Sequence, residues 1–136
     1  MPLRTAEYVQ LASFRTALRG FLRFSELQAG RVGLSSAQYQ ALLAVRASGK
    51  GGGLTINHLA RQLLIKHNSA VGLVDRLVEH GLLRRETVAQ DARKVQLRLT
   101  RRGRQVLRRL AALHRAELRR VGPALKRFLA ELSRPA

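Results

Sequence analysis

Apolar residues near the N-terminus recur at steps of three and four, which is the spacing of one face of an α-helix. Between residue 5 and about residue 28 they are Val9, Leu11, Phe14, Leu18, Phe21, Leu22 and Leu27. The narrowest stripe among them consists of Leu11, Phe14, Leu18 and Phe21. Such a stripe is typical of helices that pair with a partner helix. A helix facing the core of its own chain has almost the same pattern, so both interpretations remain open.

A second helix is predicted after a break at residues 30–33, where two glycines interrupt the pattern. Ser35 or Ser36 caps it, and it continues to about Ser48. The glycine-rich run that follows, residues 49–53, contains one lysine but lacks the Gly-Lys-Ser/Thr ending and the preceding apolar strand of a phosphate-binding loop. We therefore expect a connector there.

Two further helices follow with only three or four residues between them. The first is capped by Thr55 or Asn57. The second begins with the polar residues 66–69 and then has apolar residues at 70, 73, 74 and 77. Two short helices joined by a tight turn are typical of a helix-turn-helix, in which the second helix enters the DNA major groove.

A β-hairpin is predicted next, because Gly81 suits a helix end and period-two alternation begins soon after it. Its strands are expected at residues 82–88 and 94–99. Along the second strand Val95, Leu97 and Leu99 should face the core, while Lys94, Gln96 and Arg98 should face outward. Residues 89–93 should form the tip, where Asp91 bonds its own loop or pairs with Arg93.

Thr100 is expected to cap a long helix that runs to about residue 121. Its buried side should carry Val106, Leu107, Leu110, Leu113 and Leu118. Gly122 and Pro123 should end it, because proline interrupts a helix but starts one well, and a last helix should follow. A second subunit is the simplest place for the apolar sides of both terminal helices.

Composition adds a charge argument to this pattern. The 136 residues suit one domain and include 26 Lys and Arg against 8 Asp and Glu, a formal net charge of +18. Such an excess favours a polyanionic partner, because neutralised phosphates release counterions. An ordinary solvated surface is the alternative.

Several function classes are disfavoured. The chain has no cysteine, its four histidines lack ligand spacing, and its acidic residues are scattered. We therefore predict neither a metal site, a cofactor nor an enzyme. Charged residues interrupt the first 30 positions, so we expect no membrane span and a soluble, cytoplasmic protein.

The ordered motifs resemble the MarR family of bacterial transcription regulators across essentially the whole chain. The specific matches are Leu59-Ala60 with Leu63, then Val74-Asp75-Arg76-Leu77 with Gly81-Leu82-Leu83 and Arg85, then Asp91 and Arg93, and finally Leu97, Leu99, Thr100 and Gly103. The implied fold is mainly α with a small β-hairpin wing. It is a single winged helix-turn-helix domain over residues 1–136, with a DNA-binding lobe at about 35–100 and dimerisation helices at about 5–30 and 101–134.

The resemblance also implies partners, namely a pseudo-palindromic double-stranded DNA operator, a second copy of the chain, and a small, often phenolic or anionic, effector bound between the lobes. We place DNA contacts at Lys66, His67, Asn68, Ser69, Arg76, Asp91, Arg93 and Lys94. We place the dimer contacts at Leu11, Phe14, Leu18, Phe21, Val121, Leu125, Phe128 and Leu132. The implied function is a sequence-specific transcription regulator, most simply a repressor.

Three positions depart from the family pattern. Lys66 replaces a small capping residue, Gly72 replaces a polar or basic side chain, and Ala92 replaces a second wing arginine. No base contact is therefore expected from Gly72.

Each site assignment has an alternative in which the residue has only a structural role. Asn68 or Ser69 can simply cap the helix, and Arg76 can pair with Asp75, Glu79 or Glu86 instead of a phosphate. His114 is expected to be a hydrogen-bonded packing residue. At the level of function, the rivals are a nonspecific nucleoid-type DNA-coating protein and a basic RNA-associated module.

Overall fold

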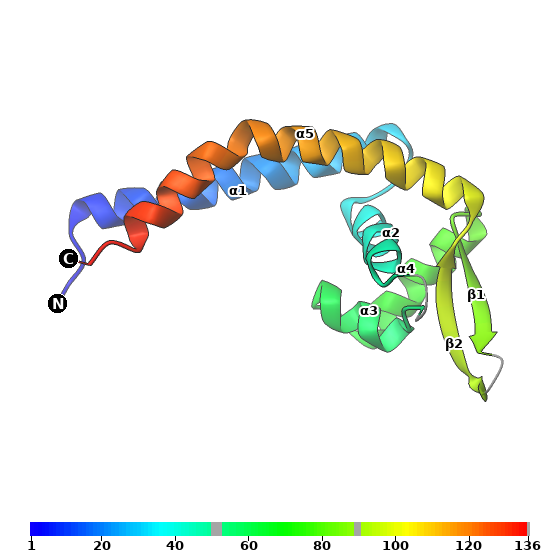
Figure 1. Cartoon of the computed structure of the whole chain (residues 1–136). Helices are drawn as coiled ribbons and strands as arrows, with labels where there is room; N and C mark the ends of the chain where they lie inside the picture. Colours follow the sequence, from blue (N-terminus) through cyan, green and yellow to red (C-terminus); the bar gives the residue numbers. More distant parts are fainter. Residues whose placement is uncertain (50–52, 89–90, 136) are drawn as a thin grey trace.

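The computed structural model describes residues 1–49, 53–88 and 91–135, with side chains described for all of these except 91–93. The described elements are α1 (Thr5–Arg31), α2 (Ser36–Ala47), α3 (Ile56–Leu63), α4 (His67–Glu79), β1 (Leu83–Val88), β2 (Asp91–Leu99) and α5 (Arg101–Leu132). Figure 1 shows a globular lobe of α2, α3, α4 and the hairpin at one end of a long arm made by α1 and α5. The predicted class, mainly helical with a β-hairpin wing, is confirmed.

The arm is an antiparallel pair, because α1 leaves the N-terminus and α5 returns beside it to the C-terminus (Figure 1). Both chain ends therefore lie together at the far end of the arm, where the Gln10 amide donates to a Glu131 carboxylate oxygen at 3.2 Å. This intrachain pairing answers the question that the apolar stripe left open: part of that stripe faces the chain's own α5.

The predicted break at Gly122 and Pro123 is wrong, because α5 continues through Pro123 to Leu132. Inside a helix, proline removes one N–H donor, and its ring crowds both the carbonyl four residues earlier and the Cβ and backbone of the residue before it. Gly122 has no Cβ, so the steric part of that cost is reduced. Residues 101–134 thus contain one curved helix along α1 rather than two (Figure 1).

The N-terminal helix is longer than predicted and passes through Gly30 to end at Arg31. Gly33 has φ of +77°, the left-handed conformation that glycine adopts without strain. The Leu34 amide then reaches back to the Ala29 carbonyl at 2.9 Å. Gly33 therefore ends the helix, while Gly30 remains helical.

Short helices in the lobe start where the predicted caps are. Ser35 forms a full capping box with Gln38, and the Thr55 hydroxyl accepts from the His58 amide at 3.2 Å. Of the alternatives, Ser35 and Thr55 are the caps. The largest fully buried side chains are Leu42, Leu59, Val74, Leu77, Leu83 and Leu97 of the lobe, together with Leu110 of α5.

The predicted inner face of the hairpin is present, because Leu97 and Leu99 are buried and Val95 is half-buried. Of the residues predicted to face outward, Lys94 is exposed, whereas Gln96 and Arg98 are half-buried. The strands pair from Leu83 with Leu99 to Val88 with Asp91, with a register shift between Thr87 and Val88. The backbone of residues 91–93 therefore belongs to β2 rather than to a loop.

A buried junction of three helices joins the arm to the lobe. His114 of α5 donates from Nδ1 to the Leu110 carbonyl at 2.7 Å, and in the neutral imidazole its Nε2 then accepts from the Ser25 hydroxyl of α1 at 2.8 Å. Its ring stacks on Tyr39 of α2 at 4.1 Å, and burial raises the pKa of the Tyr39 phenol. His114 is thus the hydrogen-bonded packing residue that the sequence predicted.

In the described part of the chain, none of the helices combines the length and the apolar character needed to cross a membrane. Across the same residues, no three His, Asp or Glu side chains gather closely enough to hold a metal ion.

Candidate nucleic-acid interface

The turn between α3 and α4 is closed by a leucine in an unusual conformation. Leu64 has φ of 56° and ψ of 42°, and its amide bonds back to the Arg61 carbonyl at 3.3 Å. The Ile65 amide bonds the Ala60 carbonyl at 3.0 Å, which completes the reversal of the chain. The predicted helix-turn-helix is therefore present.

The helix α4 has a buried face and a free front turn. Ala70, Leu73, Val74 and Leu77 are buried, whereas all of residues 66–69 are exposed. The N-cap is Lys66, which makes no side-chain bond to the helix, so the capping alternative for Asn68 and Ser69 is wrong. Exposed amides at a helix N-terminus favour anions such as phosphate.

Two surface depressions beside this turn share His67. One is lined by Asn57, Arg61 and His67, among others, and the other by Thr55, Asn57, His67 and Lys94. Lys94 of β2 thus lies near the front of α4. Asn57 and Arg61 of α3 were missed by the sequence interpretation, because both are ordinary exposed helical positions until the fold places α3 beside the α4 front turn.

Arg76 forms no ion pair within the described residues, although pairing inside the lobe was an open alternative. Asp75 pairs with Arg85 instead. Glu86 lies 3.7 Å from Arg84 and 3.4 Å from Arg98. Arg76 is exposed near the end of α4, and two of its three predicted partners, Asp75 and Glu86, are engaged elsewhere.

The predicted pair of Asp91 and Arg93 concerns side chains that lie outside the described residues. The backbone places both at the start of β2, next to the hairpin tip. Their assignment to DNA therefore stays a prediction.

Thr100 links the end of α4 to the beginning of α5. Its hydroxyl donates to the Gly81 carbonyl at 2.6 Å and accepts from the Gly103 amide at 2.9 Å. Its own amide donates to the Leu82 carbonyl at 3.1 Å. A Cβ at Gly103 would lie 2.0 Å from that same carbonyl oxygen. The sequence spacing of Thr100 and Gly103 thus reflects a close contact between the segment that follows α4 and the start of α5 in the arm.

The predicted dimer residues divide into two groups. Phe14, Phe21, Val121, Leu125 and Phe128 are half-buried. Leu11, Leu18 and Leu132 are exposed. Leu113 and Leu118, predicted to be buried on α5, are also exposed in the single chain. Apolar surface therefore remains along the arm after α1 and α5 have packed on each other.

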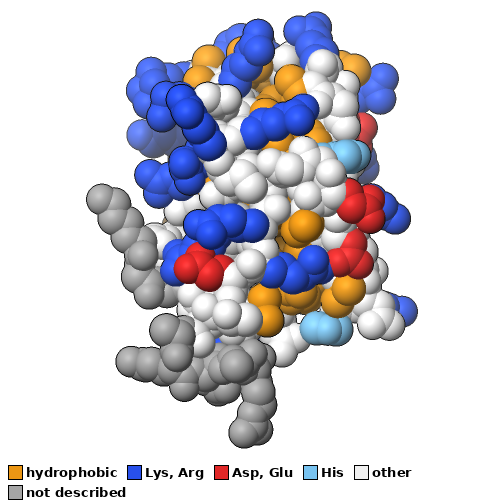
Figure 2. Space-filling view, turned by 90° about the vertical axis from the view of Figure 1, so that its right-hand side faces the viewer, with side chains coloured by type: hydrophobic (Ala, Val, Ile, Leu, Met, Phe, Trp, Pro, Cys, Tyr) orange, Lys and Arg blue, Asp and Glu red, His pale blue; other side chains and the backbone are white. Residues whose placement is uncertain are grey.

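The face at the wing end of the molecule is predominantly basic. Figure 2 shows Lys and Arg side chains gathered toward the top, on the α5 side, with few acidic ones among them.

The comparisons with known proteins agree with this geometry. Residues 32–94 match the family model described as the MarR family. No curated protein sequence matches the chain.

Solved structures have the same fold at low sequence identity. AbsC, a MarR family transcriptional regulator from Streptomyces coelicolor, has a TM-score of 0.73 and 21% identity, over 99% of this chain and 86% of AbsC. A mutant of MepR from S. aureus, bound to an oligodeoxyribonucleotide, has a TM-score of 0.70 and 20% identity, over 96% and 100% of the two chains. A mutant MarR from E. coli, complexed with operator DNA, has a TM-score of 0.61 and 20% identity, over 86% and 76%.

The family match covers α2, α3, α4, β1 and the start of β2, which are the elements that position the candidate interface. Residues 32–94 of this chain therefore form a winged helix-turn-helix that matches the MarR family model.

Proposed function

We propose that this protein is a sequence-specific double-stranded DNA-binding transcription regulator that acts as a homodimer. The carrying observation is the front turn of α4, where residues 66–69 are exposed while the opposite face of the same helix is buried. That arrangement fits insertion into a major groove. The winged helix-turn-helix match and the DNA-bound relatives named above support the same role.

The residue roles follow from chemistry and position. Asn68 and His67 offer donors and acceptors to base edges, while Ser69 and Lys66 suit phosphates. Arg76 and Lys94 extend this basic edge, and Asn57 and Arg61 join it from α3. Because a narrow minor groove concentrates negative potential, Arg93 is assigned to the groove that flanks the wing, with Asp91 orienting it.

The dimer is proposed from the arm. Tyr8, Leu11, Leu18 and Leu22 of α1 are exposed and fall within about a quarter of a helical turn of one another. Leu118, Leu129 and Leu132 form a comparable exposed stripe on α5. Large apolar stripes of this kind favour a partner surface, and a second copy would supply two reading helices for two half-sites.

Selection of bound sequences from a random pool of DNA duplexes tests the function. We expect a pseudo-palindrome whose half-site centres lie about one helical turn apart, roughly 34–36 Å. A coating protein would instead enrich no motif and would show strong salt dependence on every sequence. Enrichment of single-stranded RNA over duplex DNA in a parallel pool would favour the RNA-associated alternative.

Repression is the simplest mode, because a dimer seated on an operator blocks access of other proteins to that DNA. Transcription in vitro from a template carrying the selected sequence tests it, and increased transcript would indicate activation instead. Release by a small-molecule effector is proposed from the family resemblance alone. A phenolic carboxylate titrated into the DNA complex should lower DNA affinity if that part of the proposal holds.

A further inference from the structure

A groove of about 520 Å³ runs between α2 and α5, away from the proposed reading edge. Its residues are not among those that line the two depressions beside the front of α4. Four arginines line it, namely Arg46, Arg104, Arg108 and Arg115. Its apolar lining comes from Leu43, Leu107, Ala111 and Ala112. We call this feature the arginine groove.

The charge of the arginine groove is not neutralised by the described residues. No acidic side chain lines it, and none of its four arginines forms an ion pair in the described part of the chain. Among the described residues, Arg104 alone of the four makes a side-chain hydrogen bond, donating to the Leu99 carbonyl at 3.2 Å. An adjoining depression toward the wing shares Arg46 and Arg104 and adds Arg84 and Arg98. Arg84 and Arg98 both lie within ion-pair distance of Glu86, so the unpaired charge of the described residues on this side of the lobe belongs to the four arginines of the groove itself.

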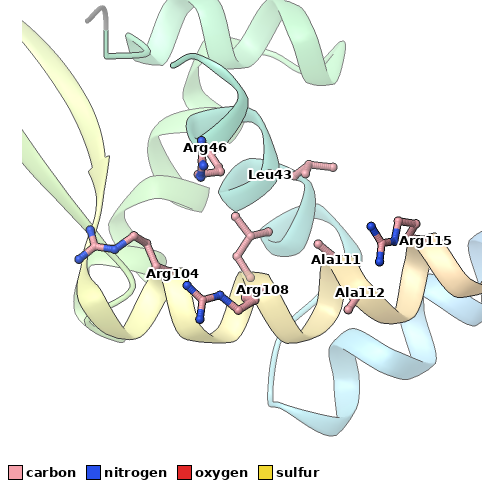
Figure 3. A pocket seen from close by; sticks show the side chains of 8 residues that line it. Leu43, Arg46, Arg104, Arg108, Ala111, Ala112 and Arg115 are labelled. Carbon is pink, nitrogen blue, oxygen red and sulfur yellow. The ribbon is translucent and has the colours of Figure 1, made fainter. Parts of the chain in front are cut away.

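The floor of the groove is apolar and partly open to solvent. Leu43 of α2 is 42% exposed, and Ala112 of α5 is exposed, whereas Leu107 is buried beneath them. Figure 3 shows Arg108 and Arg115 on α5 to either side of the two alanines, with Arg46 and Leu43 coming from α2. An occupant must therefore combine negative charge with aliphatic side chains.

A nucleic acid fits these features less well than an acidic peptide. Single strands are held by stacking on aromatic side chains as well as by charge, and no aromatic residue lines this groove. Duplex DNA presents phosphates but no aliphatic groups for the floor. Carboxylates pair with arginine guanidinium groups in a bidentate manner, and leucine-like side chains fill an apolar groove.

The spacing of the arginines suggests the form of the occupant. Along α5, Arg104 and Arg108 are one turn apart, about 6 Å, and Arg108 and Arg115 are about 10.5 Å apart. Helical carboxylates at positions i, i+4 and i+11 have the same spacing. We propose that the arginine groove docks an acidic amphipathic helix of a partner protein, on a surface distinct from the DNA-reading edge.

The test uses a fluorescent synthetic peptide with glutamates at i, i+4 and i+11 and leucines between them, titrated with the full-length protein and followed by fluorescence anisotropy. We expect saturable binding. A peptide with glutamine in place of glutamate and one with the same residues scrambled should each bind about tenfold more weakly or not at all.

Matched variants locate the binding. Arg108→Gln with Arg115→Gln should reduce peptide affinity about tenfold or more. Arg109→Gln with Arg119→Gln removes the same charge from exposed α5 positions that do not line the groove, and should change it little. Ala112→Trp should obstruct the floor with all four arginines intact, whereas Ala116→Trp, at an exposed position outside the groove, should not.

Equal losses in the two arginine pairs would overturn the proposal, because net charge alone would then explain the binding. The proposal would also be overturned if the groove variants weakened binding of an oligothymidylate but not of the peptide, because the groove would then be a nucleic-acid surface. A changed molecular mass of the Arg108 and Arg115 variant in sedimentation would assign the groove to a second copy and overturn it too. Operator affinity measured on the same samples reports separately on the proposed function.

Discussion

Leu64 is exposed to 91% and adopts the left-handed conformation at the end of α3. A side chain with a Cβ is strained there by about 1–2 kcal/mol. Its neighbours Leu63 and Ile65 are half-buried, so the turn is held by them while Leu64 itself contributes little burial. Leu64, which closes the helix-turn-helix, therefore lowers the stability of the folded protein locally.

Leu64→Gly should raise the free energy of unfolding by about 0.5–1 kcal/mol, because the strain disappears while the added flexibility of glycine offsets part of the gain. Urea denaturation measures it. Gln62→Gly, at an exposed position inside α3, is the control and should lower stability by about 1 kcal/mol. A destabilised Leu64→Gly protein would mean that the exposed leucine makes a contact in the assembled protein.

Lys66 occupies the N-cap of α4 without capping it. Lys66→Ser should stabilise the protein by about 1 kcal/mol, because the serine oxygen can accept from an amide of the first turn. The same change should weaken DNA binding and reduce the slope of log affinity against log salt by about one, since one phosphate contact is lost. Denaturation and salt-dependent binding measure the two effects. Unchanged salt dependence would remove Lys66 from the phosphate contacts.

At the scale of elements, the contact between the end of α4 and the start of α5 depends on the missing side chain of Gly103. Gly103→Ala should destabilise the protein by about 1–3 kcal/mol or more, because its Cβ would meet the Leu82 carbonyl oxygen at 2.0 Å. Thermal or urea unfolding measures this loss.

Gly72 gives the matched control for that substitution. It is also helical, but a Cβ there meets nothing within 4 Å. Gly72→Ala should therefore raise stability by about 1 kcal/mol through helix propensity. Similar destabilisation of both alanine variants would contradict the close approach at Gly103.

The junction of α1, α2 and α5 depends on one hydroxyl donor. Ser25→Ala leaves the buried Nε2 of His114 without its partner and should cost about 1–3 kcal/mol in unfolding free energy. The half-buried Ser36 hydroxyl lies 3.3 Å from the Ser25 hydroxyl and is hydrogen-bonded to it, but it does not bond His114 directly. Ser36→Ala should cost less, and an equal loss would show that the hydroxyl pair acts as one unit.

At the scale of the whole molecule, the arm has more apolar surface than its two helices can cover for each other. Leu18 is 38% exposed on the outer stripe of α1. Leu18→Glu should convert the proposed dimer to monomers, because a charge in an apolar interface is costly to bury. Sedimentation measures the mass. Thr16→Glu, exposed on a different side of α1, should leave the dimer intact. A stable Leu18→Glu dimer would place the interface elsewhere.

Most local structure could be predicted because its signals are short in sequence. Each helix cap, namely Ser35, Thr55 and Thr100, accepts from an amide three residues later in the sequence. The alternation along β2 likewise involves residues only two positions apart. Their energies are therefore local, and the predicted elements appear where the pattern put them. The α4 front turn was predictable in the same way, since its polar residues precede a buried apolar spacing.

The errors arose where a distant segment decides the outcome. Pro123 was expected to end a helix, yet α5 remains continuous alongside α1. Asn57 and Arg61 become candidate site residues only because the fold places α3 beside α4. Leu113 was expected to be buried but is exposed. No periodicity along one helix specifies which neighbour covers which face.

By itself, the sequence determined the helical and strand periods, the caps, the excess of positive charge and the motif order of a winged helix-turn-helix, because each depends on neighbouring residues. Only the tertiary structure decided which apolar residues of α1 and α5 are covered, how Thr100 and Gly103 connect the reading helix to the arm, and how Arg46 of α2 meets Arg104, Arg108 and Arg115 of α5 around one groove. Burial and charge proximity depend on residues far apart in sequence, and folding alone brings them together.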